Sequence, residues 1–106
     1  MIRYKPGVKV KGIQPEIVLA IQVAYSGYRD MYQSGDMVVT SVMDGVHSAN
    51  SLHYKGLAVD LRTRDMHLGD LERWVGGIKE CLTDEYDVVL ESNHIHIEYQ
   101  PKESYT

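Results

Sequence analysis

Residues 47–60 read HSANSLHYKGLAVD, and a later stretch, residues 91–98, reads ESNHIHIE. The later stretch alternates polar with apolar residues, which is the period-two pattern of a β-strand that buries one face. His94, His96 and Glu98 then share the other face of that strand. Two histidines and a carboxylate side by side are an unusual composition for a face that only meets solvent. These two stretches therefore form a candidate functional site.

Hydrophobic periodicity predicts two helices and four strands around these stretches. The first helix begins at Pro15, because proline is favoured at the first helical position, and Glu16 lies in its first turn. The short link between the last two strands predicts a hairpin, and therefore antiparallel pairing. The predicted helices cover residues 15–33 and 68–82, and the predicted strands cover residues 37–42, 57–61, 86–90 and 94–99.

Two further segments carry no strong pattern. Residues 1–13 are predicted to be an extended lead-in with turns, and residues 46–56 are predicted to be a loop. The element order of helix, strand, strand, helix, strand, strand indicates an α+β fold, in which a small antiparallel sheet carries the helices on one face. A chain of 106 residues has room for one modest core. Residues 1–106 are therefore predicted to form a single domain.

Composition limits the partners of the chain. The formal net charge is -4 and no basic run is present, which argues against a nucleic-acid partner. No stretch reaches the roughly 20 apolar residues of a membrane span, and the first residues lack the apolar run of a signal peptide. We therefore expect a chain that is cytoplasmic as synthesised and that meets a target outside the membrane only after release or phage-assisted delivery. We also expect it to be a monomer.

The cysteine content limits which residue types can bind a metal ion at the site. Cys81 is the single cysteine of the chain, which excludes an internal disulfide and a cysteine zinc cluster. A metal ion bound here must therefore use histidine and carboxylate ligands, which are typical of catalytic zinc.

His53, Asp60 and His96 would supply three ligands to a Zn2+ ion, and water would take the fourth place. Gly56 lets the backbone turn between His53 and Asp60, so that both side chains can reach one point. The small side chain of Ala58 leaves space beside Asp60. Zinc lowers the pKa of bound water from about 15.7 to near 7, which produces a nucleophile at neutral pH. A lone histidine is more often a surface or core residue than a ligand, but this combination favours a metal site with an open position.

The first stretch resembles a known zinc motif. It matches the S-x-H-x-x-G-x-A-x-D pattern of the M15-type zinc peptidases, and the pair formed by His94 and His96 resembles their second motif. That family includes D-alanyl-D-alanine carboxypeptidases, murein endopeptidases and phage endolysins that cut peptidoglycan stem peptides. The resemblance covers roughly residues 36–100, and the matching residues of the first motif are Ser51, His53, Gly56, Ala58 and Asp60.

The same stretches are also similar to the signalling domain of hedgehog proteins, which shares the fold of these peptidases. This similarity includes Asp44, Gly45 and His47 ahead of the first motif, and Glu91 with Ser92 ahead of the second. The hedgehog domain is a secreted signal with a zinc site, and it is much longer than this chain. The resemblance therefore implies a hedgehog/D-Ala-D-Ala peptidase-like fold, and a small bacterial or phage-type peptidase is the better fit.

The resemblance also implies roles for the residues of the site. Glu91 is predicted to be the general base, with His94 as oxyanion stabiliser or alternative base. His47 and Ser51 are predicted to contact the substrate, although the Ser51 hydroxyl could equally hold its own loop. The zinc ligands implied by the resemblance are His53, Asp60 and His96.

The predicted function is zinc-dependent hydrolysis of a peptide bond in bacterial peptidoglycan stem peptides, by a carboxypeptidase or an endopeptidase. Zinc-bound water would be the nucleophile. The alternative is a hedgehog-like, zinc-containing binding module without turnover. A purely structural zinc site is a third interpretation, in which the protein itself would fill the fourth coordination position.

Overall fold

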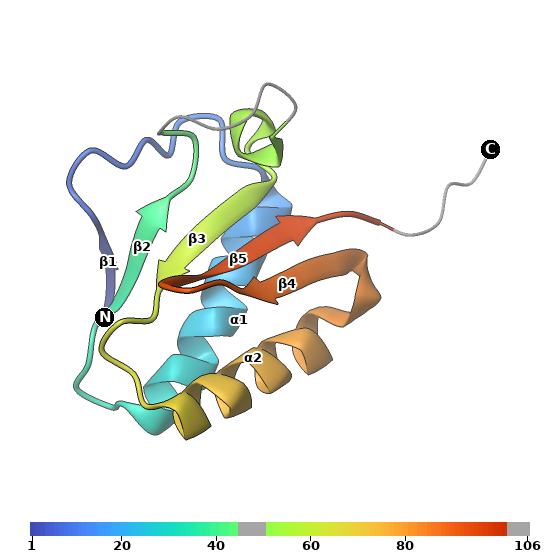
Figure 1. Ribbon diagram of the computed structural model, residues 1–106. Coiled ribbons are helices and arrows are strands. Elements are labelled where there is room, and N and C mark those ends of the chain that lie inside the picture. The colour runs from blue at the N-terminus through green and yellow to red at the C-terminus, as the bar shows by residue number, and fades with distance from the viewer. Residues whose placement is uncertain (45–50, 102–106) are drawn as a thin grey trace.

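The structure is a computed structural model, and it describes residues 1–44 and 51–101 (Figure 1). Among these residues, no helix is both long and apolar enough to cross a membrane. The helices and strands are β1 (Ile2–Tyr4), α1 (Pro15–Met31), β2 (Met37–Ser41), the 3-10 helix η1 (Leu52–Lys55), β3 (Ala58–Arg62), α2 (Leu68–Leu82), the 3-10 helix η2 (Thr83–Glu85), β4 (Tyr86–Leu90) and β5 (His94–Tyr99).

Both predicted helices and all four predicted strands are present, and the α+β class is confirmed. The ends of α2, β4 and β5 coincide with the predicted ends, and α1 begins at Pro15 as expected. The prediction of a loop over residues 46–56 is wrong at its end, where η1 forms. The rest of that segment, up to residue 50, lies outside the described residues.

The sheet is not purely antiparallel, which corrects the prediction. It has five strands in the order β1-β2-β3-β5-β4, and β1 pairs parallel to β2, whereas the other neighbouring strands pair antiparallel. The lead-in predicted for residues 1–13 contains β1, which is only three residues long and therefore too short for a periodic signal. Parallel pairing is possible because α1 forms the crossover connection between β1 and β2.

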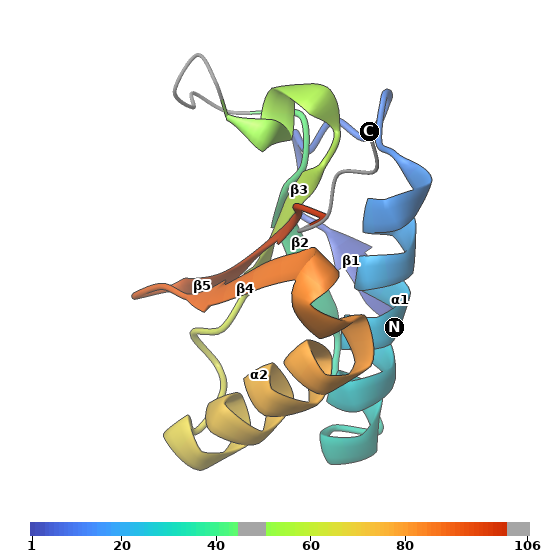
Figure 2. The same ribbon diagram turned by 90° about the vertical axis from the view of Figure 1, so that its right-hand side faces the viewer.

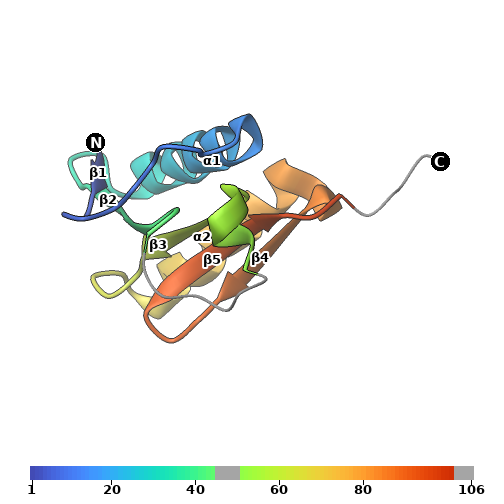
Figure 3. The same ribbon diagram turned by 90° about the horizontal axis from the view of Figure 1, so that it is seen from above.

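Both helices cover the same face of the sheet, as predicted (Figure 2, Figure 3). Trp74 of α2 is 2% exposed, and its indole Nε1 donates a hydrogen bond of 2.8 Å to the Ala24 carbonyl of α1. This bond fixes one helix against the other beneath the sheet. The buried cluster that joins the layers includes Ile17, Ile21, Val39, Leu61, Trp74, Ile78, Ile95 and Ile97.

The opposite face of the sheet carries polar side chains. In β3 and β5, these side chains alternate with the buried residues that face the helices. Asp60 of β3 is paired directly with His96 of β5, so the two side chains are neighbours on this open face. The helix η1, which contains His53, precedes β3 by a short turn at residues 56–57. The fold thus brings η1, β3 and β5 to one place on the open face.

Gly56 joins η1 to β3 in a left-handed backbone conformation, with φ 71° and ψ 20°. A Cβ atom at this position would lie 2.1 Å from the carbonyl oxygen of Gly12. The Gly56 carbonyl also accepts a hydrogen bond of 3.0 Å from the backbone N–H of Gln14. The segment before α1 therefore lies directly against this turn, and a side chain at residue 56 would push the two apart.

We predict that Gly56→Ala lowers the free energy of unfolding by about 2 kcal/mol or more, because it combines a strained left-handed backbone with a steric clash. Gly76→Ala is the control, since an added Cβ at this position of α2 meets nothing within 4 Å. Alanine there should raise stability by about 0.5–1 kcal/mol. Urea unfolding curves measure both effects, and a Gly56→Ala variant as stable as the wild type would contradict this account of the turn.

Candidate metal centre

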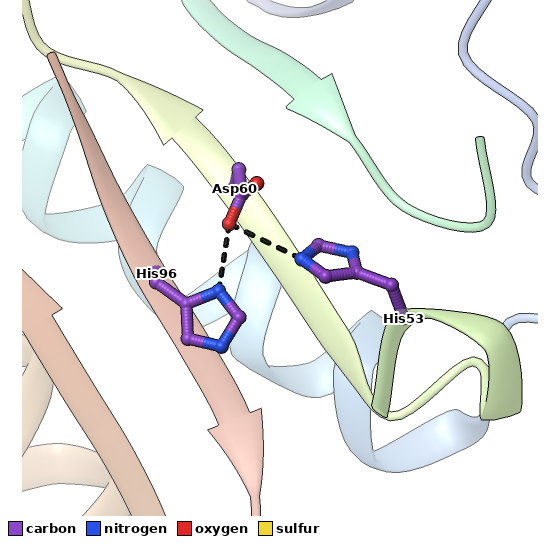
Figure 4. A group of neighbouring side chains, drawn as sticks. All are labelled: His53, Asp60 and His96. Atoms are coloured by element: carbon purple, nitrogen blue, oxygen red, sulfur yellow. Dashed lines mark hydrogen bonds and ion pairs between the residues drawn. The ribbon is translucent and has the colours of Figure 1, made fainter. Parts of the chain in front are cut away.

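Three side chains point to one position on the open face (Figure 4). His53 comes from η1, Asp60 from β3 and His96 from β5, and each offers a ligand atom within 4.8 Å of the other two. His53 Nε2 lies 3.4 Å from Asp60 Oδ1, and His96 Nδ1 lies 2.8 Å from the same oxygen. The three residues predicted as ligands are therefore brought together, and the group could hold a metal ion.

Each imidazole of this group is held by a hydrogen bond at its outer nitrogen. His53 Nδ1 donates to the Val42 carbonyl at 2.7 Å, and His96 Nε2 donates to Glu98 Oε1 at 2.7 Å. A carbonyl and an ionised carboxylate can only accept, so the outer nitrogens carry hydrogens. The inner nitrogens, His53 Nε2 and His96 Nδ1, both face Asp60. Either nitrogen can offer its lone pair to a cation once it carries no proton, which is the tautomer that a metal ligand requires.

Asp60 is the anionic member of the group. Its side chain is 14% exposed, and that of His53 is 3% exposed. Burial by itself raises the pKa of Asp60, but hydrogen bonds from His53 and His96 outweigh this effect and hold the pKa well below its usual range. Asp60 is therefore ionised at neutral pH and does not have to lose a proton before it binds a cation.

His96 stands between two carboxylates. The hydrogen bond to Asp60 raises the pKa of His96, burial lowers it, and the hydrogen bond to Glu98 raises it again, so that the net shift is upward. The surroundings of Asp60 thus favour a positive charge next to its carboxylate. A proton on His96 Nδ1 and a metal ion at the same place are alternative ways to satisfy that carboxylate.

Local structure fixes His53 at the start of its helix. Ser51 caps η1, because its Oγ accepts a hydrogen bond of 3.2 Å from the backbone N–H of His53. Gly56 ends the same helix with its left-handed conformation. Ser51 and Gly56 therefore hold the loop that carries His53, the first of the predicted ligands. The predicted substrate contact of Ser51 stays a prediction beside this structural role.

His94 borders the group without belonging to it. Its Nε2 lies 3.8 Å from Asp60 Oδ1, and its Nδ1 donates a hydrogen bond of 2.6 Å to Asn93 Oδ1. Glu91 is exposed in the turn between β4 and β5, where its backbone N–H donates to the His94 carbonyl at 2.8 Å. Its role as general base stays a prediction. His47 falls within residues 45–50 and lies outside the described residues.

Glu98 is a site residue to which the sequence analysis assigned no role. The signal for it was present, because the period of two along β5 places Glu98 on the same face as His96. Its contact with His96 Nε2 became visible only in the structure. The Val42 carbonyl behind His53 has no sequence signal, because any residue supplies a backbone acceptor.

No family model and no curated protein matches the chain. The three residues offer two imidazole nitrogens and a carboxylate oxygen, which are donor atoms that could hold a metal ion. Two imidazole nitrogens and one carboxylate oxygen form a set that is typical of catalytic zinc, with the fourth position left to water. The single cysteine, Cys81, is exposed on α2, which packs on the other face of the sheet.

We predict that His53→Ala, Asp60→Ala and His96→Ala each lose zinc binding, because the two remaining ligands would hold the ion far more weakly. Elemental analysis after dialysis should find stoichiometric zinc in the wild type and little in these variants. His67→Ala is the control, since His67 is exposed just before α2. Full zinc content in any one of the three variants would remove that residue from the ligand set.

Glu98→Gln keeps the size of the side chain but removes the charge that accepts from His96 Nε2. We predict that the zinc affinity falls roughly 10–100-fold while the fold is preserved, because such partners orient the ligating imidazole. Competition with a chelating dye measures the affinity. Glu80→Gln, at an exposed position on α2, should have no effect. An equal affinity in Glu98→Gln and wild type would show that Glu98 is not part of the site.

Proposed function

We propose that this protein is an M15-like zinc metallopeptidase that hydrolyses a peptide bond of bacterial peptidoglycan stem peptides, as a carboxypeptidase or an endopeptidase. The observation that carries the proposal is the convergence of His53 Nε2, Asp60 Oδ1 and His96 Nδ1 on one point. These residues occupy the ligand positions of the M15-type motifs. Three protein ligands also leave one coordination position for water, as catalytic zinc sites do.

When bound, zinc would polarise the scissile carbonyl and lower the pKa of water to about 7. The protein itself must then hold the ligands in place, admit the peptide and transfer a proton. The hydrogen bonds from His53 to Val42 and from His96 to Glu98 hold the ligands in place. A peptide can enter because the site lies on the open face, beside a cleft that includes Asp60 in its lining.

His94 is well placed for the proton transfer. Because its Nδ1 donates to Asn93 Oδ1, the lone pair of Nε2 faces the site, 3.8 Å from Asp60 Oδ1. Nε2 is then a proton acceptor that can take a proton from the attacking water and deliver it to the leaving amine. In its protonated form, the same nitrogen can donate to the oxyanion of the tetrahedral intermediate.

Glu91 is the base favoured by the resemblance, and it is a neighbour of His94 across the hairpin turn. A carboxylate there would act through the same water molecule if its side chain turned toward the site. Substitution separates these two candidates for the base. If His94 is the base, replacing His94 removes the proton acceptor, and if Glu91 is the base, replacing Glu91 does so. Neither substitution changes the predicted zinc ligands.

We predict that the zinc-loaded protein releases peptide fragments from purified peptidoglycan, and that a chelator abolishes the release. Mass spectrometry identifies the products and hence the bond that is cut. His94→Gln should lower kcat by about 10²–10⁴-fold, the usual contribution of a general base, at unchanged zinc content. Glu91→Gln is measured in parallel. A larger loss in Glu91→Gln than in His94→Gln would transfer the role of base to Glu91.

One observation favours a second candidate function. Glu91 is exposed and lies outside the group of three metal-ligating residues. A zinc site without a positioned base would suit a hedgehog-like binding module without turnover. Zinc-loaded wild type that releases no fragments from several chemically different peptidoglycans would overturn the peptidase proposal and favour this module.

A further inference from the structure

A second feature of the open face lies next to the metal centre. It is a cleft of about 400 Å³ that includes Asp60 and His94 in its lining. Two neutral polar residues, Thr40 and Asn93, also line it. The remaining lining residues are all cationic, and they are Lys5, Arg62 and Arg64. We call this feature the basic cleft.

Strand pairing sets the position of the basic cleft. Asp60 and Arg62 are two residues apart on β3, so both side chains lie on the open face. Asp60 pairs with His96, and Arg62 pairs with His94. Two residues along a strand span about 7 Å, which is the length of about two residues of an extended peptide. A peptide whose carbonyl lies at the metal centre would therefore reach the basic cleft within one or two residues.

The cleft gathers positive charge in a chain whose net charge is -4. Within residues 1–44 and 51–101, no carboxylate forms an ion pair with Lys5, Arg62 or Arg64. Asp60, the acidic residue of the cleft, is engaged by the imidazoles of the metal centre. Three cations that line a common space, with no ion-pair partner among the described residues, raise the local concentration of anions there.

We propose that the basic cleft is a subsite for a carboxylate group of the substrate, with Arg62 and Arg64 as the residues that bind it. A guanidinium binds a carboxylate through two parallel hydrogen bonds, which fixes its direction as well as its distance. Arg62 is half-buried, so its contact is screened less than one at a fully exposed side chain. Lys5 adds charge at the rim. The choice of a peptide carboxylate as the ligand rests on the proposed peptidase function.

A carboxylate near the scissile bond can come from the C-terminus of the peptide or from an acidic side chain. N-acetyl-D-alanyl-D-alanine and its C-terminal amide test the first source. N-acetyl-D-alanyl-D-glutamic acid α-amide and its glutamine counterpart test the second. Isothermal titration calorimetry with the zinc-loaded protein measures the affinity of all four. We expect the acid of at least one pair to bind roughly tenfold more tightly than its neutral partner, as charge-assisted hydrogen bonds do.

The carboxylate could instead bind to the zinc, and substitution of the arginines separates the two cases. Arg62→Gln and Arg64→Gln should each reduce the preference for the acid by roughly tenfold, with unchanged zinc content and unchanged affinity for the amide. Arg29→Gln is the control, because Arg29 is exposed in the last turn of α1, in the helical layer. Arg64 is exposed, so its substitution tests the subsite even if Arg62→Gln does not fold.

The difference in affinity between acid and amide peptides can be measured whether or not the protein hydrolyses them. Equal affinity for acid and amide in both pairs, or a preference that persists in both arginine variants, would overturn the subsite while any hydrolysis of the peptides still supports the peptidase. A preference that the arginine variants lose, in a protein that cleaves none of the peptides, would support the subsite and count against the peptidase. Added salt should weaken a preference that depends on the arginines.

Discussion

The antiparallel pairing of β3 with β5 is the constraint on which the candidate site depends. This pairing places the carboxylate of Asp60 next to the imidazole of His96. A shift of the pairing by one residue would send these side chains to the opposite face of the sheet. Such a shift is opposed by the core, because it would expose the apolar residues that alternate with Asp60 and His96 along these strands. These residues, Val59, Leu61, Ile95 and Ile97, have no exposed surface. The hydrophobic face of the sheet therefore positions the polar one.

The polar residues of the site form a chain of alternating bases and acids, from His53 through Asp60 and His96 to Glu98. A buried carboxylate is costly unless it is paired and hydrogen-bonded. Within the described part of the chain, no buried side-chain nitrogen or oxygen lacks a hydrogen-bond partner. The network therefore leaves no buried polar side-chain atom of the described residues unpaired, and the inner nitrogens of His53 and His96 both face Asp60 Oδ1. This arrangement suits a cation, because one ion between the inner atoms can replace several weaker contacts.

The two faces of the sheet have different roles, one in stability and the other in the candidate site. The face covered by α1 and α2 holds the apolar cluster, and substitutions there act on stability. The open face holds the candidate metal centre and the basic cleft, where substitutions act on charge and on the donor atoms of His53, Asp60 and His96. Gly56 links the two, because its turn supports η1 on one side and contacts the segment before α1 on the other. Gly56 offers no side-chain donor atom, but its turn helps to hold His53 in place at the site.

Both helices, four of the five strands and the three residues that converge at the site were predictable from the order of residues along the chain. These features were predictable because they are local: periodicity along β5 assigns His96 and Glu98 to one face, and motif spacing relates His53 to Asp60. Three features came from the folded chain alone: β1 joins the sheet in parallel, the Val42 carbonyl accepts a hydrogen bond from His53, and Lys5 lines the same cleft as Arg62 beside the candidate metal centre. Each of these contacts joins segments that are distant along the chain. No local pattern of side chains records them, because they depend on the order in which the strands pair and on where the backbone passes.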